Sequence, residues 1–102
     1  MKFTVNVFGR KFRYNMTLEE LIEAYAETMF GYTENTYMDG HIDEMPPIEE
    51  FVEDVYRYVV NGYKCAIALD GTEIEMVFPD EVRFLGAEKI KRIIRSVYYE
   101  VE

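Results

Sequence analysis

The sequence predicts an α+β fold in which an antiparallel sheet of about four strands carries three helices on one face. Two observations lead to this prediction. Two stretches alternate apolar and polar residues on either side of a tight-turn dipeptide, and three stretches repeat apolar residues at helical spacing. Each hairpin and each helix would then have one apolar side to bury against the other layer. The expected order is ββααββα, and a chain of 102 residues is expected to form one globular domain, 1–102.

The first hairpin is expected over residues 3–8 and 11–16. Apolar residues occupy every second position in both segments, and the alternate positions of the second segment are polar or basic. Gly9-Arg10 stands between them with glycine first, as a type II′ turn requires.

The first helix is expected to begin after Thr17 and to end at Gly31. Thr17 is followed three residues later by Glu20, a capping-box pattern in which each side chain bonds a free backbone amide of the other residue. Glycine is the commonest residue just beyond a helix end. The apolar stripe of this helix comprises Leu18, Leu21, Ile22, Tyr25 and Met29.

Residues 30–46 show no clear period and are expected to form a long loop. Pro46-Pro47 then marks the start of the second helix, because proline is tolerated in a first helical turn. Asn61-Gly62 marks its end.

The second hairpin is expected over residues 63–69 and 73–78. Asp70-Gly71 between them is a strong signal for a type I′ turn, which needs positive φ at both central positions. Residues 80–86 are expected to be irregular or to form a short turn, and a third helix is expected from Ala87 to Tyr99.

Acidic residues are concentrated in the middle of the chain. Residues 14–56 contain twelve Asp and Glu and no Lys or Arg, whereas the first thirteen residues contain four bases and no acid. Residues 57–102 contain seven bases and eight acids, so the net charge of -9 comes from the middle block. Charge segregated in this way steers a basic partner and disfavours DNA or anionic lipid as a direct ligand of the acidic block.

The acids of the two middle helices form rows. Glu19, Glu23 and Glu27 recur every four residues in the first helix, and Glu50 and Asp54 do so in the second. Such rows repeat a carboxylate every ~6 Å and cost roughly 0.2–0.5 kcal/mol per like-charge pair. We expect the two helices to present these carboxylates on a common surface, either as a solvated face or as a surface that meets a basic partner; metal binding is a weaker alternative.

The 30–46 loop is the second candidate, since it combines aromatic and methionine side chains with acids. It either packs back onto the domain or presents apolar anchors inside a charged rim, the usual anatomy of an interface. The residues expected to contact a partner, on the helices and the loop together, are Glu20, Glu23, Glu27, Tyr32, Glu34, Tyr37, Met38, Asp39, Asp43, Glu44, Glu50, Glu53 and Asp54.

Catalytic and metal-binding motifs are weak. The 35–46 segment resembles a calcium loop, but Tyr37 and Pro46 replace two of its ligands. His41 is the only histidine, and Cys65 is expected to be a buried, inert thiol on the apolar side of its strand. We therefore expect no catalytic residue, no metal site and no cofactor.

A single cysteine rules out an internal disulfide and fits a reducing compartment. The sequence has no signal-peptide pattern and no run of apolar residues long enough for a membrane span, so we expect a cytoplasmic protein that does not bind a membrane.

These features predict a small acidic, non-enzymatic protein-binding domain that engages a basic partner protein, such as a nucleic-acid-binding protein or complex, as an inhibitor or nucleic-acid mimic. In size and charge the chain resembles the small acidic inhibitors of phages and mobile elements, such as anti-restriction and anti-CRISPR proteins, although no residue motif carries that likeness. The alternatives are a self-assembling structural or regulatory subunit, such as a homodimer, and a small metal-dependent enzyme.

Overall fold

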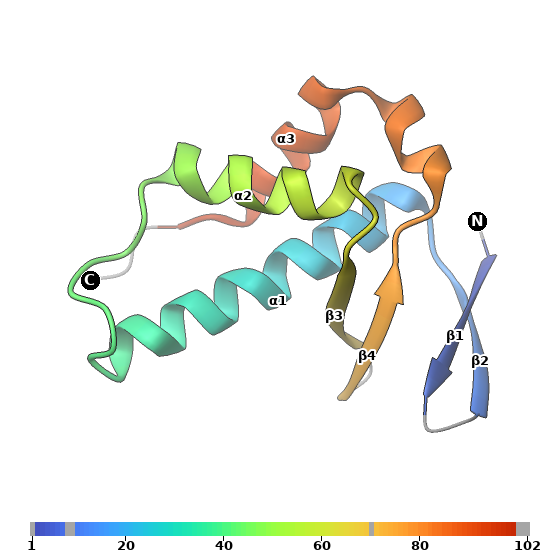
Figure 1. Cartoon of the computed structure of the whole chain (residues 1–102), viewed down its shortest axis with the longest axis horizontal. Coiled ribbons are helices and arrows are strands. Elements are labelled where there is room, and N and C mark those ends of the chain that lie inside the picture. Colours follow the sequence, from blue (N-terminus) through green and yellow to red (C-terminus); the bar gives the residue numbers. More distant parts are fainter. Residues whose placement is uncertain (1, 8–9, 70, 100–102) are drawn as a thin grey trace.

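The computed structural model describes residues 2–7, 10–69 and 71–99, and Figure 1 shows how their elements are arranged. Three α-helices pack together, and two short hairpins lie at one end of the helical group. In chain order the elements are β1 (Lys2–Val7), β2 (Arg10–Asn15), α1 (Leu18–Met38), α2 (Ile48–Val60), β3 (Lys64–Leu69), β4 (Thr72–Val77), the 3₁₀-helix η1 (Asp80–Leu85) and α3 (Ala87–Val97).

The prediction of a ββααββα fold with a four-stranded sheet is wrong. The described strands form two separate two-stranded antiparallel sheets, β1–β2 and β3–β4. The fold is helix-rich, and the 3₁₀-helix η1 stands between β4 and α3. β1 lies beside β4 without joining its ladder (Figure 1). A turn dipeptide and an alternating pattern specify pairing within a hairpin, but they carry no information on pairing between hairpins.

The expected packing of all three helices on one face of a sheet is also wrong. β3–β4 packs against α1, whereas α2 and α3 pack mainly with the other helical elements. A two-stranded sheet offers too small a face for three helices, so the helices bury much of their apolar surface against one another.

The backbone of the first hairpin pairs Phe3 with Tyr14 and Val5 with Phe12. The turn predicted at Gly9-Arg10 lies partly outside the described residues, because Gly9 is not among them. Arg10 belongs to β2, where it pairs with Val7. In the second hairpin Leu69 pairs with Thr72, and Asp70 lies outside the described residues.

Helix α1 begins as the sequence predicts. The Glu20 amide donates to the Thr17 hydroxyl at 3.1 Å, and the Thr17 amide donates to the Glu20 carboxylate at 3.2 Å. This reciprocal capping box satisfies two backbone amides that have no partner within the helix.

The predicted helix end at Gly31 and the predicted 30–46 loop are wrong, because α1 continues to Met38. A glycine in a helix interior costs roughly 1 kcal/mol, which the added helical turns and their packing offset. The helix instead ends around Gly40, whose φ is +78°. The Gly40 amide donates to the Tyr37 carbonyl at 3.1 Å and the His41 amide donates to the Thr36 carbonyl at 3.0 Å, the bond pair of a Schellman motif.

The core is one cluster shared by the three α-helices, β3, η1 and Phe78 after β4. Phe30 of α1 meets Phe51 of α2 edge-on, with ring centroids 5.7 Å apart, and Tyr98 after α3 contacts both rings. The buried members of the cluster are Leu21, Ile22, Tyr25, Ala26, Phe30, Phe51, Val52, Val55, Val59, Cys65, Ile67, Phe78, Val82, Ile90 and Ile94. Within the described part of the chain, each helix is too short or too polar to cross a bilayer.

The two glycines of α1 provide a test of where the helix ends. A methyl group at Gly31 would meet nothing within 4 Å, so Gly31→Ala should raise the free energy of unfolding by about 0.5–1 kcal/mol. Gly40→Ala should lower it by about 1–2 kcal/mol, because the positive φ disfavours a residue with a Cβ atom. Urea unfolding followed by circular dichroism measures both changes. A destabilising Gly31→Ala would place the helix end at Gly31 after all.

Candidate functional site

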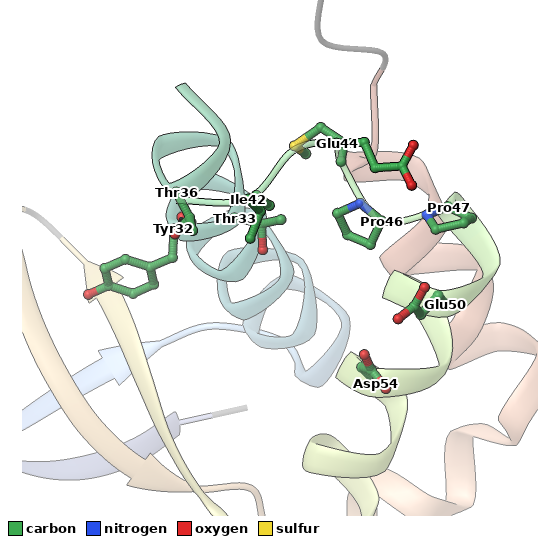
Figure 2. Close-up of a pocket in the computed structure, with 10 residues that line it drawn as sticks. Tyr32, Thr33, Thr36, Ile42, Glu44, Pro46, Pro47, Glu50 and Asp54 are labelled. Carbon is green, nitrogen blue, oxygen red and sulfur yellow. Dashed lines mark hydrogen bonds between the residues drawn. The ribbon is translucent and has the colours of Figure 1, made fainter. Parts of the chain in front are cut away.

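A groove of about 530 Å³ lies between the second half of α1 and the first half of α2, under the loop that joins them. Figure 2 shows the side chains of the two helices and the loop around it. The lining residues are Tyr32, Thr33, Thr36, Ile42, Glu44, Met45, Pro46, Pro47, Glu50 and Asp54.

The α1 wall of the groove is uncharged. The hydroxyls of Thr33 and Thr36 donate to the carbonyls of Met29 and Tyr32, at 2.9 and 2.8 Å, so their protons are already used within the helix. Tyr32 is 46% exposed, and a hydrogen bond to the Glu73 carboxylate of β4 raises the pKa of its phenol. Glu73 therefore adds negative charge at the Tyr32 end of this wall.

The α2 wall and the loop supply the charge of the groove. Glu50 and Asp54 lie one turn apart on α2, about 6 Å along its axis, and Glu44 lies on the loop (Figure 2). The described lining therefore includes three carboxylates and no Lys or Arg. Asp54 is bonded by Arg57 from the next turn of the same helix, a pair in which both side chains are largely exposed. Screening by water makes such a pair weak, so Asp54 can exchange it for another cation.

Apolar residues of the loop complete the groove, and aromatic residues hold the loop in place. Ile42, Met45 and Pro46 are half-buried in the groove lining. The Tyr98 hydroxyl donates to the Pro46 carbonyl of the loop. The Phe30, Phe51 and Tyr98 rings pack beneath it. These contacts tie the loop that borders the groove to the aromatic part of the core.

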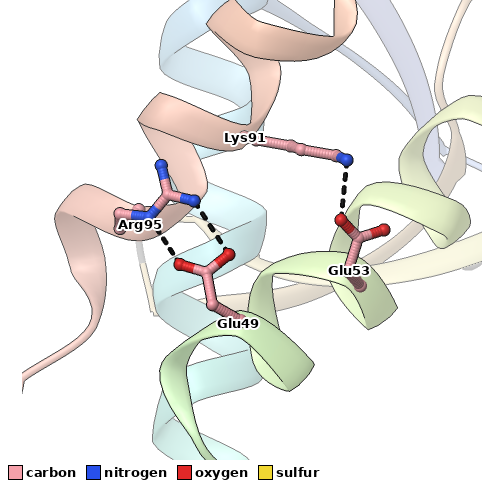
Figure 3. Close-up of polar contacts among 4 residues, drawn as sticks. All are labelled: Glu49, Glu53, Lys91 and Arg95. Carbon is pink, nitrogen blue, oxygen red and sulfur yellow. Dashed lines mark hydrogen bonds and ion pairs between the residues drawn. The ribbon is translucent and has the colours of Figure 1, made fainter.

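Several acids of the middle block are paired with bases of α3. Arg95 donates to both carboxylate oxygens of Glu49, at 3.1 and 3.0 Å, and Lys91 donates to Glu53 at 2.6 Å (Figure 3). The bond to Glu53 is the main reason that the pKa of Lys91 is raised.

Glu19 at the start of α1 is paired in the same way, with Lys89 at 3.2 Å. Backbone hydrogen bonding and, next, the Lys89 bond hold the pKa of Glu19 below its usual range. Both ends of the acidic block therefore meet bases from the C-terminal helix.

The structure does not bring the acids of α1 to the groove. Glu23 and Tyr32 are nine residues apart, as are Glu27 and Thr36, and nine residues are about two and a half helical turns. Glu23 and Glu27 therefore lie on the opposite side of α1 from the groove, where both are exposed. Glu20 is exposed as well, and its carboxylate accepts the capping bond from Thr17.

The remaining expected residues lie around the far end of α1. Glu34 accepts a hydrogen bond from the Tyr99 hydroxyl, and Tyr37 is half-buried. Met38, Asp39 and Asp43 are exposed at the helix end and on the loop, outside the groove lining. Of the residues expected to contact a partner, the groove therefore unites Tyr32, Glu44, Glu50 and Asp54.

Sequence reasoning missed the uncharged half of the groove. The predicted 30–46 loop includes Thr33 and Thr36, and Pro46-Pro47 predicts only a helix start. Continuing the helical period past Gly31 would have placed Tyr32, Thr33 and Thr36 on one side of α1.

Neither a metal site nor an activated thiol is visible in the described part of the chain. There, His, Cys, Asp and Glu side chains form no group of three or more that could hold a metal ion. Cys65 is 2% exposed, its thiol donates to the Tyr63 carbonyl at 3.4 Å, and burial raises its pKa. A thiol with a raised pKa carries little of the nucleophilic thiolate at neutral pH.

Comparisons of the chain with protein-family models, with curated proteins and with solved structures found no match.

Burial of Cys65 and Tyr25 has a consequence for stability in alkali. Burial raises the pKa of Cys65 above its ordinary value of 9.0 and that of Tyr25 above its usual range. The unfolded chain therefore loses these protons first, and the free energy of unfolding should fall as the pH rises above 9.0.

Urea unfolding at a series of pH values measures this fall. Cys65→Ala should be less stable than the parent at neutral pH because of the cavity it leaves. Its stability should nevertheless fall less steeply just above pH 9.0. Identical slopes for parent and variant would show that Cys65 ionises equally in the folded and unfolded chains.

Proposed function

We propose that this chain is a non-enzymatic protein-binding domain whose groove between α1 and α2 accepts a basic segment of a partner protein. The observation that supports this most directly is the composition of the groove. Half-buried apolar residues lie beside the carboxylates of Glu44, Glu50 and Asp54, and no base lines the described groove. Apolar contact surrounded by charge is the usual arrangement of a protein interface, and complementary charge sets both specificity and association rate.

Only the acids that line the groove are proposed to contact the partner. Glu49 and Glu53 already have partners on α3, and Glu23 and Glu27 lie on the opposite side of α1. These acids contribute to the long-range field that attracts a basic partner, whereas the groove supplies the contacts.

A nucleic-acid-binding protein or complex is the kind of partner that suits this charge, because its basic segments bind a row of anions. Holding such a segment in the groove would make the chain an inhibitor, the role of the small acidic phage and mobile-element proteins that it resembles in size and charge. A cytoplasmic location, favoured by the single unpaired cysteine, is part of the same proposal.

Charge reversal in the groove tests the proposal. The ligand is a dye-labelled peptide in which two arginines flank a leucine, and fluorescence anisotropy measures its affinity. Glu44→Lys with Glu50→Lys should weaken binding on the order of tenfold or more, because two attractive charges become repulsive. The affinity of the parent should also fall with added salt.

The matched control reverses the same number of charges on the other side of α1, by Glu23→Lys with Glu27→Lys. Both pairs change the net charge equally, so only the groove variant should lose most of its affinity. Equal losses in the two variants would mean that net charge alone attracts the peptide and that the groove is not a binding site. Glu53 is left unchanged because its reversal would set a lysine against Lys91.

A further inference from the structure

The binding surface does not stop at the end of the groove. One side of α2 and its C-cap carries a row of residues that begins at Glu50. The residues four, seven, eight and eleven positions further along are Asp54, Arg57, Tyr58 and Asn61. The described neighbours of α2 leave this side uncovered, since only Asp54 among these residues is as much as half-buried. This row leads from the acidic groove to a second hollow.

The second hollow has a volume of about 340 Å³ and is lined by Arg57, Tyr58, Asn61 and Tyr63. The rings of Tyr58 and Tyr63 meet edge-to-face with centroids 5.6 Å apart, and they are 43% and 54% exposed. Tyr25 and Phe78 form an aromatic pair at the same separation in the core, where both residues are buried. The Tyr58–Tyr63 pair thus exposes large apolar ring faces to water. Such exposure is typical of residues that become buried only when a partner binds.

We infer that the basic segment bound in the groove extends along α2 and places a second cationic side chain, preferably arginine, on the Tyr58–Tyr63 pair. This inference rests on the proposed function of the groove. An aromatic face attracts a cation, and arginine also stacks on it. The fold already contains one such contact, in which the Lys91 ammonium lies 4.9 Å from the centre of the Tyr56 ring.

Arg57 lies between the two hollows and links them. Its guanidinium is bonded to Asp54, and its side chain is 65% exposed. Of the described residues that line the second hollow, Arg57 is the only charged one, and its bond to Asp54 offsets its positive charge there. The first cation of the ligand should therefore bind Glu44 and Glu50 and leave the Arg57–Asp54 pair in place. Anionic segments are disfavoured along the same path by Glu50 and Asp54.

The length of this surface sets the spacing of the ligand's charges. Glu50 and Asn61 are eleven residues apart, or about 16 Å along the axis. An extended peptide covers that distance with about five residues, at roughly 3.3 Å each. The partner segment should therefore carry one basic group for the groove and another about five residues along.

Two peptides of equal length test this inference by fluorescence anisotropy. Both carry the arginine-leucine-arginine group, and one has a distal arginine about five residues further along, where the other has alanine. The distal arginine should strengthen binding to the parent by about fivefold. Tyr58→Ala with Tyr63→Ala should remove that preference and leave the alanine peptide's affinity unchanged, while Tyr58→Phe with Tyr63→Phe should keep it, because phenylalanine retains an aromatic face.

Phe84→Ala is the control for losing an exposed aromatic side chain elsewhere, since Phe84 is 89% exposed and lines neither hollow. A preference that survives in the double alanine variant, or that is absent in the parent, would overturn the tyrosine contact while leaving the groove intact. A third peptide has proline at the distal position. If it binds more tightly than the distal-arginine peptide, the tyrosine pair prefers proline and the inferred cation contact is wrong. If Glu44→Lys with Glu50→Lys leaves both arginine peptides bound as before, the groove itself is wrong.

Discussion

The arrangement of this molecule depends on the packing of α1 and α2 against helix α3. α1 and α2 each contact α3 more extensively than they contact one another. Ile90 and Ile94 of α3 are buried in the shared core, and bases on its flanks pair with Glu19, Glu49 and Glu53. Two acidic helices that would repel each other are thus joined through a third that is apolar on one side and basic beside it.

This arrangement also explains why a groove exists. Because α3 carries much of the packing between α1 and α2, the sides of these helices that face away from α3 are not pressed together near the loop. Glu49 and Glu50 are neighbours in sequence but about 100° apart around α2, so one meets Arg95 and the other lines the groove. Helix geometry places the two acids on different sides of α2, and the position of α3 decides which of them is paired.

Local signals were reliable where a few adjacent residues determine the outcome. Thr17 and Glu20 form the expected capping box, and Cys65 is buried on the apolar side of its strand. The predicted helix end at Gly31 is wrong because glycine only weakens a helix, and the backbone geometry that ends α1 is found at Gly40 instead. The predicted loop therefore includes the residues that form the α1 wall of the groove.

The sequence by itself determined the charge of the middle block, the apolar stripes of the helices and the residues able to cap or turn the chain, since these depend on composition and on neighbours a few positions apart. Only the tertiary structure decided that the hairpins remain separate ladders, which acids meet α3 and which face the groove. Those outcomes depend on contacts between residues such as Glu49 and Arg95, forty-six positions apart. No periodicity within a single helix encodes the direction from which another helix will approach.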